Sequence, residues 1–554
     1  MVINTRENTI IEFYIRILDP DYHWISLSDS KDNLMRLSAT HTPLACLKAK
    51  LSADSCYLIT YAGLELCLCY YYEPDTVLTD GVTFVENNIG YNKENMDSGH
   101  QSLHQETYHF TPFKNWMNDP NGLCWYHGYY HLFYQFHPYA PEPGCMYWGH
   151  AISKDLLHWT HLPIAFSPQE EIMKGSKLRG GAWSGSALPL QDQVRLFFTR
   201  HIGPNNDRSI KHEYQVSVTS KDLLTFSKES TVLDGPPREE IASDIRDPKV
   251  FRYQSNWYMV LGSACNQIPA VLLYSSEDLD NWSYQGVLYQ EASKDTVAFE
   301  CPDFFEIDGT YILTVSKMRH TDEMGRKDTT HYYAGTFDGK CFHPHSDGLL
   351  DFGGNIYAVQ TFLHENRRIA LGWISDFYKE HISENNNVYG SLSLPRELRL
   401  SANHKVLLNL PVREVYDLQK ETLYEGPLQR TRLILPTAAF YACLEFPSSC
   451  KFKIKLNERT DGASFQLIGT GDTVEFKTIG VPSEQIRFLS PSIPINKLEI
   501  FMDHRTCEIF INNGEAAGTK IFYGDNNYYI FTCESINTKK IPHLTIKQMQ
   551  LKNS

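Results

Sequence analysis

A turn followed by a strongly β-prone strand recurs along the middle of the chain. Its five copies are GYYHLFYQF from Gly128, VRLFFTR from Val194, NWYMVLGS from Asn256, GTYILTVS from Gly309 and NRRIALGW from Asn366. They start 53 to 66 residues apart, and in the first three repeats a second phrase follows as SKDLLHW, SKDLLTF or SEDLDNW. Repeats of this length that hold several short strands are typical of propeller blades. The spacing therefore predicts an all-β chain built around a five-bladed β-propeller.

The register of these repeats brings three acidic residues into corresponding positions. Nine residues before each repeated strand, the chain reads Asp119, Gly185, Asp247, Glu300 and Tyr357. The first strand of a propeller blade lines the central channel, so equivalent residues converge there however far apart they lie in sequence. An isolated Asp before Pro is usually a turn former. The common register nevertheless predicts that the three acids face one another across one cavity.

The segments on either side of the repeats have a different texture. Residues 1–104 are predicted to be a β-rich N-terminal module and linker, because strand-like runs such as CYLITYAGLELCLCYYY end in the aperiodic NNIGYNKENMDSGHQSLH. Residues 105–412 form the predicted propeller. Residues 413–554 alternate strands with turns, which predicts a C-terminal β-sandwich. The role of the module stays open between a structural or oligomerising part and sugar binding through its tyrosines.

Composition limits the partners of the chain. At 554 residues with 42% apolar content, it is too long for a single core. Its net charge of −15 comes without a basic block, which argues against nucleic acid or an anionic membrane as partners. No run approaches the roughly 20 apolar residues that span a bilayer, and no secretion signal is visible. The thirteen cysteines are interpreted as reduced thiols, so we expect a cytoplasmic protein, monomeric or homo-oligomeric.

The surroundings of the three acids suggest different roles in breaking a glycosidic bond. That reaction needs one carboxylate at the anomeric carbon and one protonated carboxyl group at the leaving oxygen. Asp119 lies between two asparagines in NWMNDPNGL, and their amides would keep it ionised as a nucleophile. Glu300 lies in the more apolar AFECPDFF, where desolvation would raise its pKa, as a general acid requires. Asp247 follows Arg246, whose charge would keep it ionised to steady the sugar hydroxyls.

A series of longer motifs resembles one known family. The segments YHFTPFKNWMNDPNGL, YHLFYQ, YWGHAISKDLLHW, WSGSA, RDPKVF, FECPDFF, YYAGTFDG, GGNIYAVQTF, LGWISD and LPREL occur in the order and spacing of glycoside hydrolase family 32. That family contains invertases, levanases, inulinases and sucrose-6-phosphate hydrolases. The resemblance runs from about Tyr108 to Val412, and more loosely beyond. It implies a propeller followed by a sandwich, release of terminal β-fructose with retention of configuration, and no metal or other cofactor.

Carried over residue by residue, the resemblance assigns roles within the predicted cavity. It places the nucleophile on Asp119, the transition-state stabiliser on Asp247 and the acid/base on Glu300. It also implies a set of side chains that contact the sugar. These are Asn118, Gln135, Trp148, Trp183, Ser184, Arg246 and Trp373. Trp148 and Trp373 would serve equally well as core residues of the blades.

Two departures from the family pattern bear on the choice of substrate. His137 stands where many relatives have Asn, and Asn355 where relatives often have an Asp that helps recognise the leaving group. We therefore predict an invertase-like β-fructofuranosidase acting on sucrose, sucrose 6-phosphate or short fructo-oligosaccharides, with the choice among them open. Three alternatives stay open: a fructosyltransferase on the same fold, an inverting five-bladed glycosidase acting on arabinan or xylan, and a catalytically silent sugar-binding protein.

Overall fold

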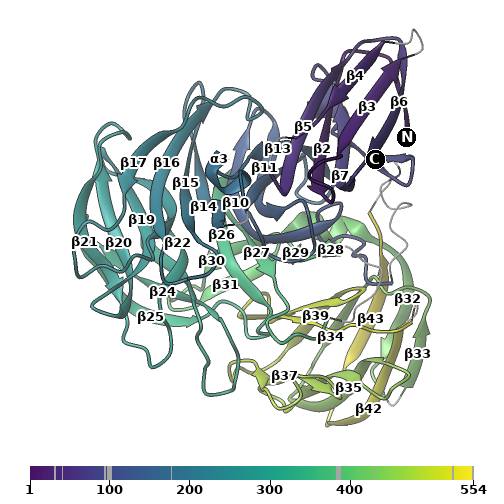
Figure 1. Ribbon diagram of the computed structural model, residues 1–554. Coiled ribbons are helices and arrows are strands. Elements are labelled where there is room, and N and C mark those ends of the chain that lie inside the picture. The colour runs from purple at the N-terminus through teal and green to yellow at the C-terminus, as the bar shows by residue number, and fades with distance from the viewer. Residues whose placement is uncertain are drawn as a thin grey trace.

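Strands make up nearly all of the regular structure (Figure 1). The computed structural model describes residues 1–29, 33–39, 42–92, 95, 103–175, 177–381, 388–429, 431–526 and 529–551. The helical segments are short: α1 (Val77–Asp80), α3 (Glu170–Met173) and a 3-10 turn over Arg413–Leu418. Nowhere in this described part of the chain does a helix have the length and apolar character needed to cross a bilayer. The predicted all-β class is confirmed.

Five consecutive sheets form the centre of the molecule. The first joins β10 (Asn115–Tyr126), β11 (Tyr129–His137), β12 (Tyr147–Ser153) and β13 (Trp159–Phe166). The second joins β14 (Leu178–Pro189), β15 (Val194–Pro204), β16 (His212–Ser220) and β17 (Ser230–Asp234). The third joins β18 (Arg246–Tyr253), β19 (Asn256–Cys265), β20 (Ile268–Ser276) and β21 (Ser283–Gln290).

The last two sheets complete the series. The fourth joins β22 (Phe299–Ile307), β23 (Thr310–Lys317), β24 (Thr330–Phe337) and β25 (Phe342–Leu349). The fifth joins β26 (Ile356–His364), β27 (Arg367–Ile374), β30 (Arg396–Leu400) and β31 (Leu407–Pro411), with β29 (Ser391–Leu392) beside β27. A short strand, β28 (Val388–Tyr389), pairs in parallel with β10 of the first sheet.

The innermost strands of these sheets close into a ring. Strand β10 contacts β14, each innermost strand contacts the next in turn, and β26 contacts β10 again. The five strands recognised in the sequence are β11, β15, β19, β23 and β27, and each of them is the second strand of its sheet. The predicted propeller is therefore confirmed, and its sheets are consecutive along the chain.

The N-terminal residues form two further sheets, drawn in purple beside the propeller in Figure 1. One has the order β1 (Val2–Thr5), β6 (Ser55–Ala62), β3 (Trp24–Asp29) and β4 (Leu34–Leu37). The other has the order β5 (Leu44–Leu51), β2 (Thr9–Ile17), β7 (Leu64–Tyr72), β8 (Thr83–Glu86) and β9 (Ile89–Tyr91). We call these two sheets the N-terminal module.

Two six-stranded sheets follow the propeller and enclose a separate apolar core. One has the order β32 (Gln419–Pro427), β43 (His543–Met549), β34 (Phe440–Glu445), β39 (Lys497–Asp503), β40 (Thr506–Ile511) and β41 (Ala516–Ile521). The other has the order β33 (Thr431–Leu435), β42 (Tyr529–Thr538), β35 (Cys450–Glu458), β36 (Ser464–Gly469), β37 (Val474–Ile479) and β38 (Phe488–Leu489). The predicted C-terminal sandwich is confirmed.

One hydrophobic core continues through all three parts of the chain. It contains Tyr14 and Tyr70 of the module, Tyr130 and Tyr147 of the first blade, and Phe501 of the sandwich. Burial of aromatic side chains of this size is a large favourable contribution to folding. The module and the sandwich are thus held to the propeller by apolar packing as well as by the chain.

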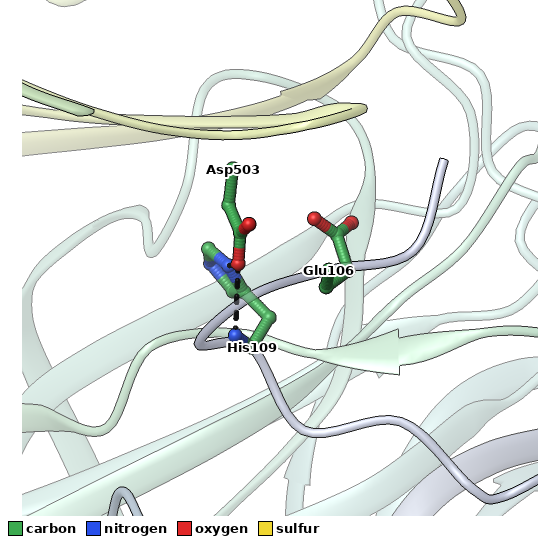
Figure 2. Close-up of side chains that lie close together, drawn as sticks. All are labelled: Glu106, His109 and Asp503. Carbon is green, nitrogen blue, oxygen red and sulfur yellow. Dashed lines mark hydrogen bonds and ion pairs between the residues drawn. The ribbon is translucent and has the colours of Figure 1, made fainter. Parts of the chain in front are cut away.

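A buried polar cluster joins the segment before the propeller to the sandwich (Figure 2). The ring nitrogens of His109 lie 2.9 Å from Asp503 Oδ2 and 2.9 Å from Glu508 Oε1. Glu106 Oε1 accepts a hydrogen bond from Arg505 Nε over 3.0 Å. Glu106, His109 and Asp503 have the spacing of possible metal ligands, but both nitrogens of His109 already face carboxylates. A buried imidazolium accounts for the cluster, and burial alone would lower the pKa of His109, which the two carboxylates instead raise to about 10.

Replacing His109 with Gln is expected to destabilise the fold most strongly at and below about pH 6.5. The change removes the cation that Asp503 and Glu508 share, although Glu508 keeps its ion pair with Arg396. Removing one partner of a buried ion pair costs about 3–5 kcal/mol in other proteins. The pKa of His109 is raised from 6.5 to about 10 by folding. Its contribution is therefore complete below about pH 6.5 and fades as the pH rises toward 10.

Urea denaturation of the parent and His109→Gln proteins at several pH values across this range measures the effect. The difference in unfolding free energy should shrink as the pH rises. His345→Gln, on an exposed residue of β25, is the matched control. A difference that stays constant or grows across the range would contradict the ion-pair account.

Candidate active site

One cavity of about 730 Å³ is lined by side chains from all five innermost strands. Asp119, Asp247 and Glu300 line it together. The cavity lining also contains most of the side chains expected to contact the sugar. These are Asn118, Gln135, Trp183, Ser184, Arg246 and Trp373. The structure thus brings together three acids that lie far apart in the sequence, in a space of the size typical of small-molecule sites.

A β-bulge at a matching place in each innermost strand aims its side chains into this cavity. The pairing with the neighbouring strand skips residues 118–119, 183–184, 247–248, 301–302 and 358–359. A bulge interrupts the alternation of faces, so successive residues can point the same way. When the innermost strands are aligned by these bulges, Glu300 corresponds to Arg246 and Tyr357. Asp247 lies one position after the position of Glu300, and Asp119 lies two positions after it. The predicted strict equivalence of the three acids is therefore wrong, although they do lie on one ring.

Asp119 is partly buried and is oriented by hydrogen-bond donors. Ser184 Oγ donates to its Oδ2 over 2.6 Å, and Cys301 Sγ lies 3.6 Å from the same oxygen. Gln135 Nε2 in turn donates to Ser184 Oγ over 3.2 Å. Burial raises the pKa of Asp119, and the hydrogen bonds, including one with Asn118, offset part of that rise. The predicted effect of a neighbouring amide is present, but burial outweighs it.

Glu300 is held at both carboxylate oxygens. Arg246 Nη1 donates to Oε1 over 3.0 Å, and the Tyr357 hydroxyl donates to Oε2 over 2.6 Å. Burial raises the pKa of Glu300, while Arg246 and Tyr357 lower it in part, and the net direction is upward. The direction agrees with the sequence-based expectation for Glu300. A carboxyl group of this kind keeps its proton to a higher pH than an exposed one.

Asp247 differs from the expectation drawn from its neighbour Arg246. Its Oδ2 accepts a hydrogen bond from the backbone N–H of Cys301 over 2.8 Å. Burial raises its pKa to about 8, Arg246 lowers it, and the nearby Glu300 and Asp119 raise it again. The prediction that Arg246 keeps Asp247 ionised is wrong, because burial and two like charges outweigh one arginine. Three carboxyl groups around one cavity retain a proton more readily than separate ones would.

Arg246 is fixed by a set of acids that the sequence did not reveal. Glu213, on β16, accepts a hydrogen bond from Arg246 Nη2 over 2.8 Å and another from His201 Nδ1 over 2.9 Å. Asp244 accepts a further hydrogen bond from Arg246. The guanidinium carbon lies 5.1 Å from the centre of the Trp183 ring. Glu213 lies on an outer strand without a recognisable motif, whereas the shared register had already singled out Tyr357 without giving it a role.

The tryptophans divide between cavity and core. Trp183 lines the cavity and stacks on His201 with ring centres 3.9 Å apart. Trp373 also lines it, and its Nε1 has no hydrogen-bond partner among the described residues. Trp148 is fully buried in the core of the first two blades, where its Nε1 donates to the carbonyl oxygen of Trp183 over 3.0 Å. The expected sugar contact from Trp148 is therefore replaced by support for the backbone of Trp183.

The two residues that depart from the family pattern lie in different places. His137 lines the cavity, and its Nδ1 lies 2.7 Å from the carbonyl oxygen of Glu142. Burial lowers the pKa of His137, which favours the neutral ring. Asn355 is fully buried outside the cavity lining and accepts a hydrogen bond from Lys520 Nζ over 3.1 Å. Asn355 therefore connects the fifth blade to the sandwich, and only His137 is placed to contact a substrate.

A propeller with a sandwich behind it and three carboxyl groups on one cavity defines a carbohydrate-cleaving enzyme, a glycoside hydrolase. Residues 109–411 match the family model described as the Glycosyl hydrolases family 32 N-terminal domain. Residues 457–548 match the one described as Glycosyl hydrolases family 32 C terminal. The chain belongs to glycosyl hydrolase family 32, as its motifs had indicated.

Individual relatives agree with this assignment. The chain is 31% identical over 463 residues to the sucrose-6-phosphate hydrolase of Zymomonas mobilis, which covers 76% of this chain and 87% of that protein. A family 32 structure from Bifidobacterium adolescentis superposes with a TM-score of 0.90 at 25% identity and covers 99% of both chains. A mutant β-fructofuranosidase of Bombyx mori in complex with sucrose has a TM-score of 0.71 at 26% identity, and covers 83% of this chain and 96% of its own.

Replacing Glu213 with Gln is expected to lower kcat/KM for fructose release from sucrose by about 10- to 100-fold. The change keeps the shape of the side chain but removes the charge that fixes Arg246, so Glu300 loses its defined position. Initial rates of fructose release over a range of sucrose concentrations measure the effect, which should fall mainly on kcat. Glu239→Gln, at an exposed position, is the matched control. Parental kcat in a folded Glu213→Gln protein would contradict this positioning role.

Proposed function

We propose that the chain is a retaining β-fructofuranosidase that releases terminal fructose from sucrose, sucrose 6-phosphate or short fructo-oligosaccharides. The single observation that supports this most is the arrangement around Glu300, whose partly buried carboxyl group is held at both oxygens beside Asp119 and Asp247. The names of the relatives, a sucrose-6-phosphate hydrolase and a β-fructofuranosidase with bound sucrose, agree with it.

In the first step, Asp119 attacks the anomeric carbon of the terminal fructose. A bond forms between its carboxylate oxygen and that carbon while the bond to the glycosidic oxygen breaks. Glu300 gives its proton to the departing oxygen, which leaves as a hydroxyl group of the released sugar. The raised pKa of Glu300 supports this role, because the acid must still hold its proton near neutral pH.

In the second step, water takes the place of the leaving group. Glu300, now a carboxylate, accepts a proton from the water, whose oxygen attacks the anomeric carbon. The bond to Asp119 breaks, fructose is released with its original configuration, and both acids return to their starting states. Ser184 and Cys301 support the exchange of charge at Asp119, because both face its Oδ2.

The remaining polar side chains of the cavity are proposed to hold the sugar. Asp247 is placed to bind fructose hydroxyls, and its ionised form would steady the positive charge that develops on the ring. The Trp373 ring forms part of the cavity wall and can pack against the sugar, whereas its Nε1 atom is buried. Asn118 and Gln135 complete the set. The open alternatives among substrates concern the leaving group, which lies beyond these residues.

The direct test is to incubate the purified protein with sucrose, sucrose 6-phosphate, 1-kestose, inulin and levan and to measure released fructose. NMR of the first-formed anomer distinguishes retention from the inverting alternative. Growth of oligosaccharides at high sucrose would favour a fructosyltransferase. Binding of sucrose without any fructose release would favour a silent sugar-binding protein and overturn the proposal.

Asp119→Asn and Glu300→Gln are expected to respond differently to the quality of the leaving group. Without its nucleophile, the enzyme should lose about four or more orders of magnitude in kcat on every substrate. The Glu300→Gln variant should lose far less on an aryl β-fructoside than on sucrose, because an aryl leaving group needs no proton. Equal losses on both substrates for Glu300→Gln would contradict its role as the acid.

Tyr357→Phe is expected to move the alkaline limb of the kcat/KM profile to higher pH. The Tyr357 hydroxyl stabilises ionised Glu300, so its removal raises the pKa of that acid further. A hydrogen bond to a charged group corresponds to a shift of about one pH unit. The profile from about pH 5 to 9 measures it, with Tyr129→Phe, outside the cavity lining, as the control. A downward shift would contradict this coupling.

Several further expectations stay predictions. We propose that residues 1–104, 105–412 and 413–554 are the units of the chain, as the texture of the sequence suggests. A cytoplasmic location rests on the interpretation of the thirteen cysteines as reduced thiols, and a monomeric or homo-oligomeric state is open to gel filtration with light scattering. Neither nucleic acid nor a membrane is proposed as a partner.

A further inference from the structure

The wall of the active-site cavity includes residues of the N-terminal module. Arg16, Pro43 and Leu44 line the same cavity as the three acids. Arg16 lies near the end of β2, and Leu44 opens the neighbouring strand β5, opposite Arg16 in the pairing register. The backbone N–H of Ile17 donates to the carbonyl oxygen of Pro43 over 3.0 Å. The three residues therefore form one continuous edge of the module, which we call the module edge.

The module edge lies at the outer part of the cavity. Asp119 and Glu300 lie on innermost strands of the ring, and the Glu300 side chain is 20% exposed. The Arg16 side chain is 40% exposed, and Pro43 is exposed. The terminal fructose must reach the inner acids, and its anomeric carbon carries the rest of the substrate. The leaving group therefore extends outward, toward the module edge.

The module edge is fixed against the first blade. Tyr14, two residues before Arg16 in β2, packs against Tyr139 and Tyr147, and its ring centre lies 6.0 and 5.8 Å from theirs. Arg16 Nη2 donates to the carbonyl oxygen of Tyr139 over 3.1 Å. Tyr139 lies in the connection between β11 and β12, whose residues Gly144 and Cys145 also line the cavity. The module edge and this connection therefore stabilise each other.

A second anchor lies deeper in the module. The Tyr70 hydroxyl donates to Glu12 Oε2 over 2.7 Å and accepts a hydrogen bond from the backbone N–H of Ile164 over 3.1 Å. Glu12 is fully buried and also pairs with Lys48 Nζ at 2.8 Å. Because buried, satisfied polar groups resist displacement, the module edge cannot swing away to admit a long chain without breaking these contacts.

We propose that the N-terminal module completes the active site by forming the outer wall of the leaving-group subsite. This wall selects β-fructosides whose leaving group is one or two sugar units and disfavours fructan polymers. The inference rests on the proposed β-fructosidase activity. The cavity volume of about 730 Å³ suits a short oligosaccharide rather than an open groove. The family model begins at residue 109, so this wall lies outside the part of the chain that the model describes.

The test uses the full chain, because deleting the module would expose the core that it shares with the first blade. Two substitutions at Leu44 make the leaving-group subsite narrower or wider. Leu44→Trp adds bulk at the module edge, and Leu44→Ala removes it. Leu34→Trp, on the 65% exposed Leu34 of β4, is the matched control. The measured quantities are kcat and KM for sucrose, 1-kestose and inulin, with thermal unfolding of each variant.

For Leu44→Trp, we expect kcat/KM on 1-kestose to fall about tenfold relative to sucrose, through KM rather than kcat. For Leu44→Ala, we expect kcat/KM on inulin to rise severalfold relative to sucrose. Leu34→Trp should keep the parental ratios. Unchanged ratios in folded Leu44 variants, or an equal change on all three substrates, would overturn the inference.

Two further outcomes have defined meanings. If Leu44→Trp does not fold, the Leu44→Ala and Arg16→Met variants test the inference instead. Arg16→Met should also raise the ratio of kcat/KM on inulin to kcat/KM on sucrose, because it releases the connection between β11 and β12. If the parent releases no fructose from any substrate, the proposed function fails. If the parent is active and the ratios do not respond, the activity stands and the inference alone fails.

Discussion

The closure of five innermost strands into one ring is the constraint on which the active site depends. Each blade could bury its faces against its neighbours in an open array, but only a closed ring brings β10 against β26. Closure turns the start of every innermost strand toward the same axis. The bulge in each strand then lets two successive residues enter the cavity where regular pleating would admit one. Asp119 follows Asn118 into the cavity in this way, and Asp247 follows Arg246.

The charge of the site is balanced by one arginine. Arg246 contacts Glu300, Glu213 and Asp244, and it is buried. A buried guanidinium without these acids would be costly, and the acids without it would be costly as well. Because Glu213 and Asp244 share the charge of Arg246, the arginine lowers the pKa of Glu300 only in part. The net shift of the Glu300 pKa is therefore upward, which is the direction that a general acid requires.

Much of the fold and of the site was predictable from the sequence. The repeated strands predicted the propeller, because their periodicity follows from the geometry of a blade. The three acids could be found because each lies at a fixed sequence distance from such a strand. The role of Glu213 could not be found, because it depends on packing between blades rather than on local pattern, and the sequence left Trp148 open between sugar contact and blade core. The charge state of Asp247 was also beyond reach, since a sequence shows the neighbouring Arg246 but not the burial that outweighs it. The module edge could not be predicted either, because no motif near Arg16 or Leu44 in the sequence indicates contact with the propeller.

Because the module and the first blade share one aromatic core, the module can complete its packing only after the first blade has been synthesised. Tyr14 and Tyr70 precede the first blade along the chain, so they leave the ribosome before their packing partner Tyr147. The module therefore exposes an apolar aromatic surface until the first blade has emerged and covered it. The ring itself can close only after β26 and β28 have been made, near residue 389. Until then, the innermost strands lack their partners across the closure, a state in which exposed apolar surface favours association between chains.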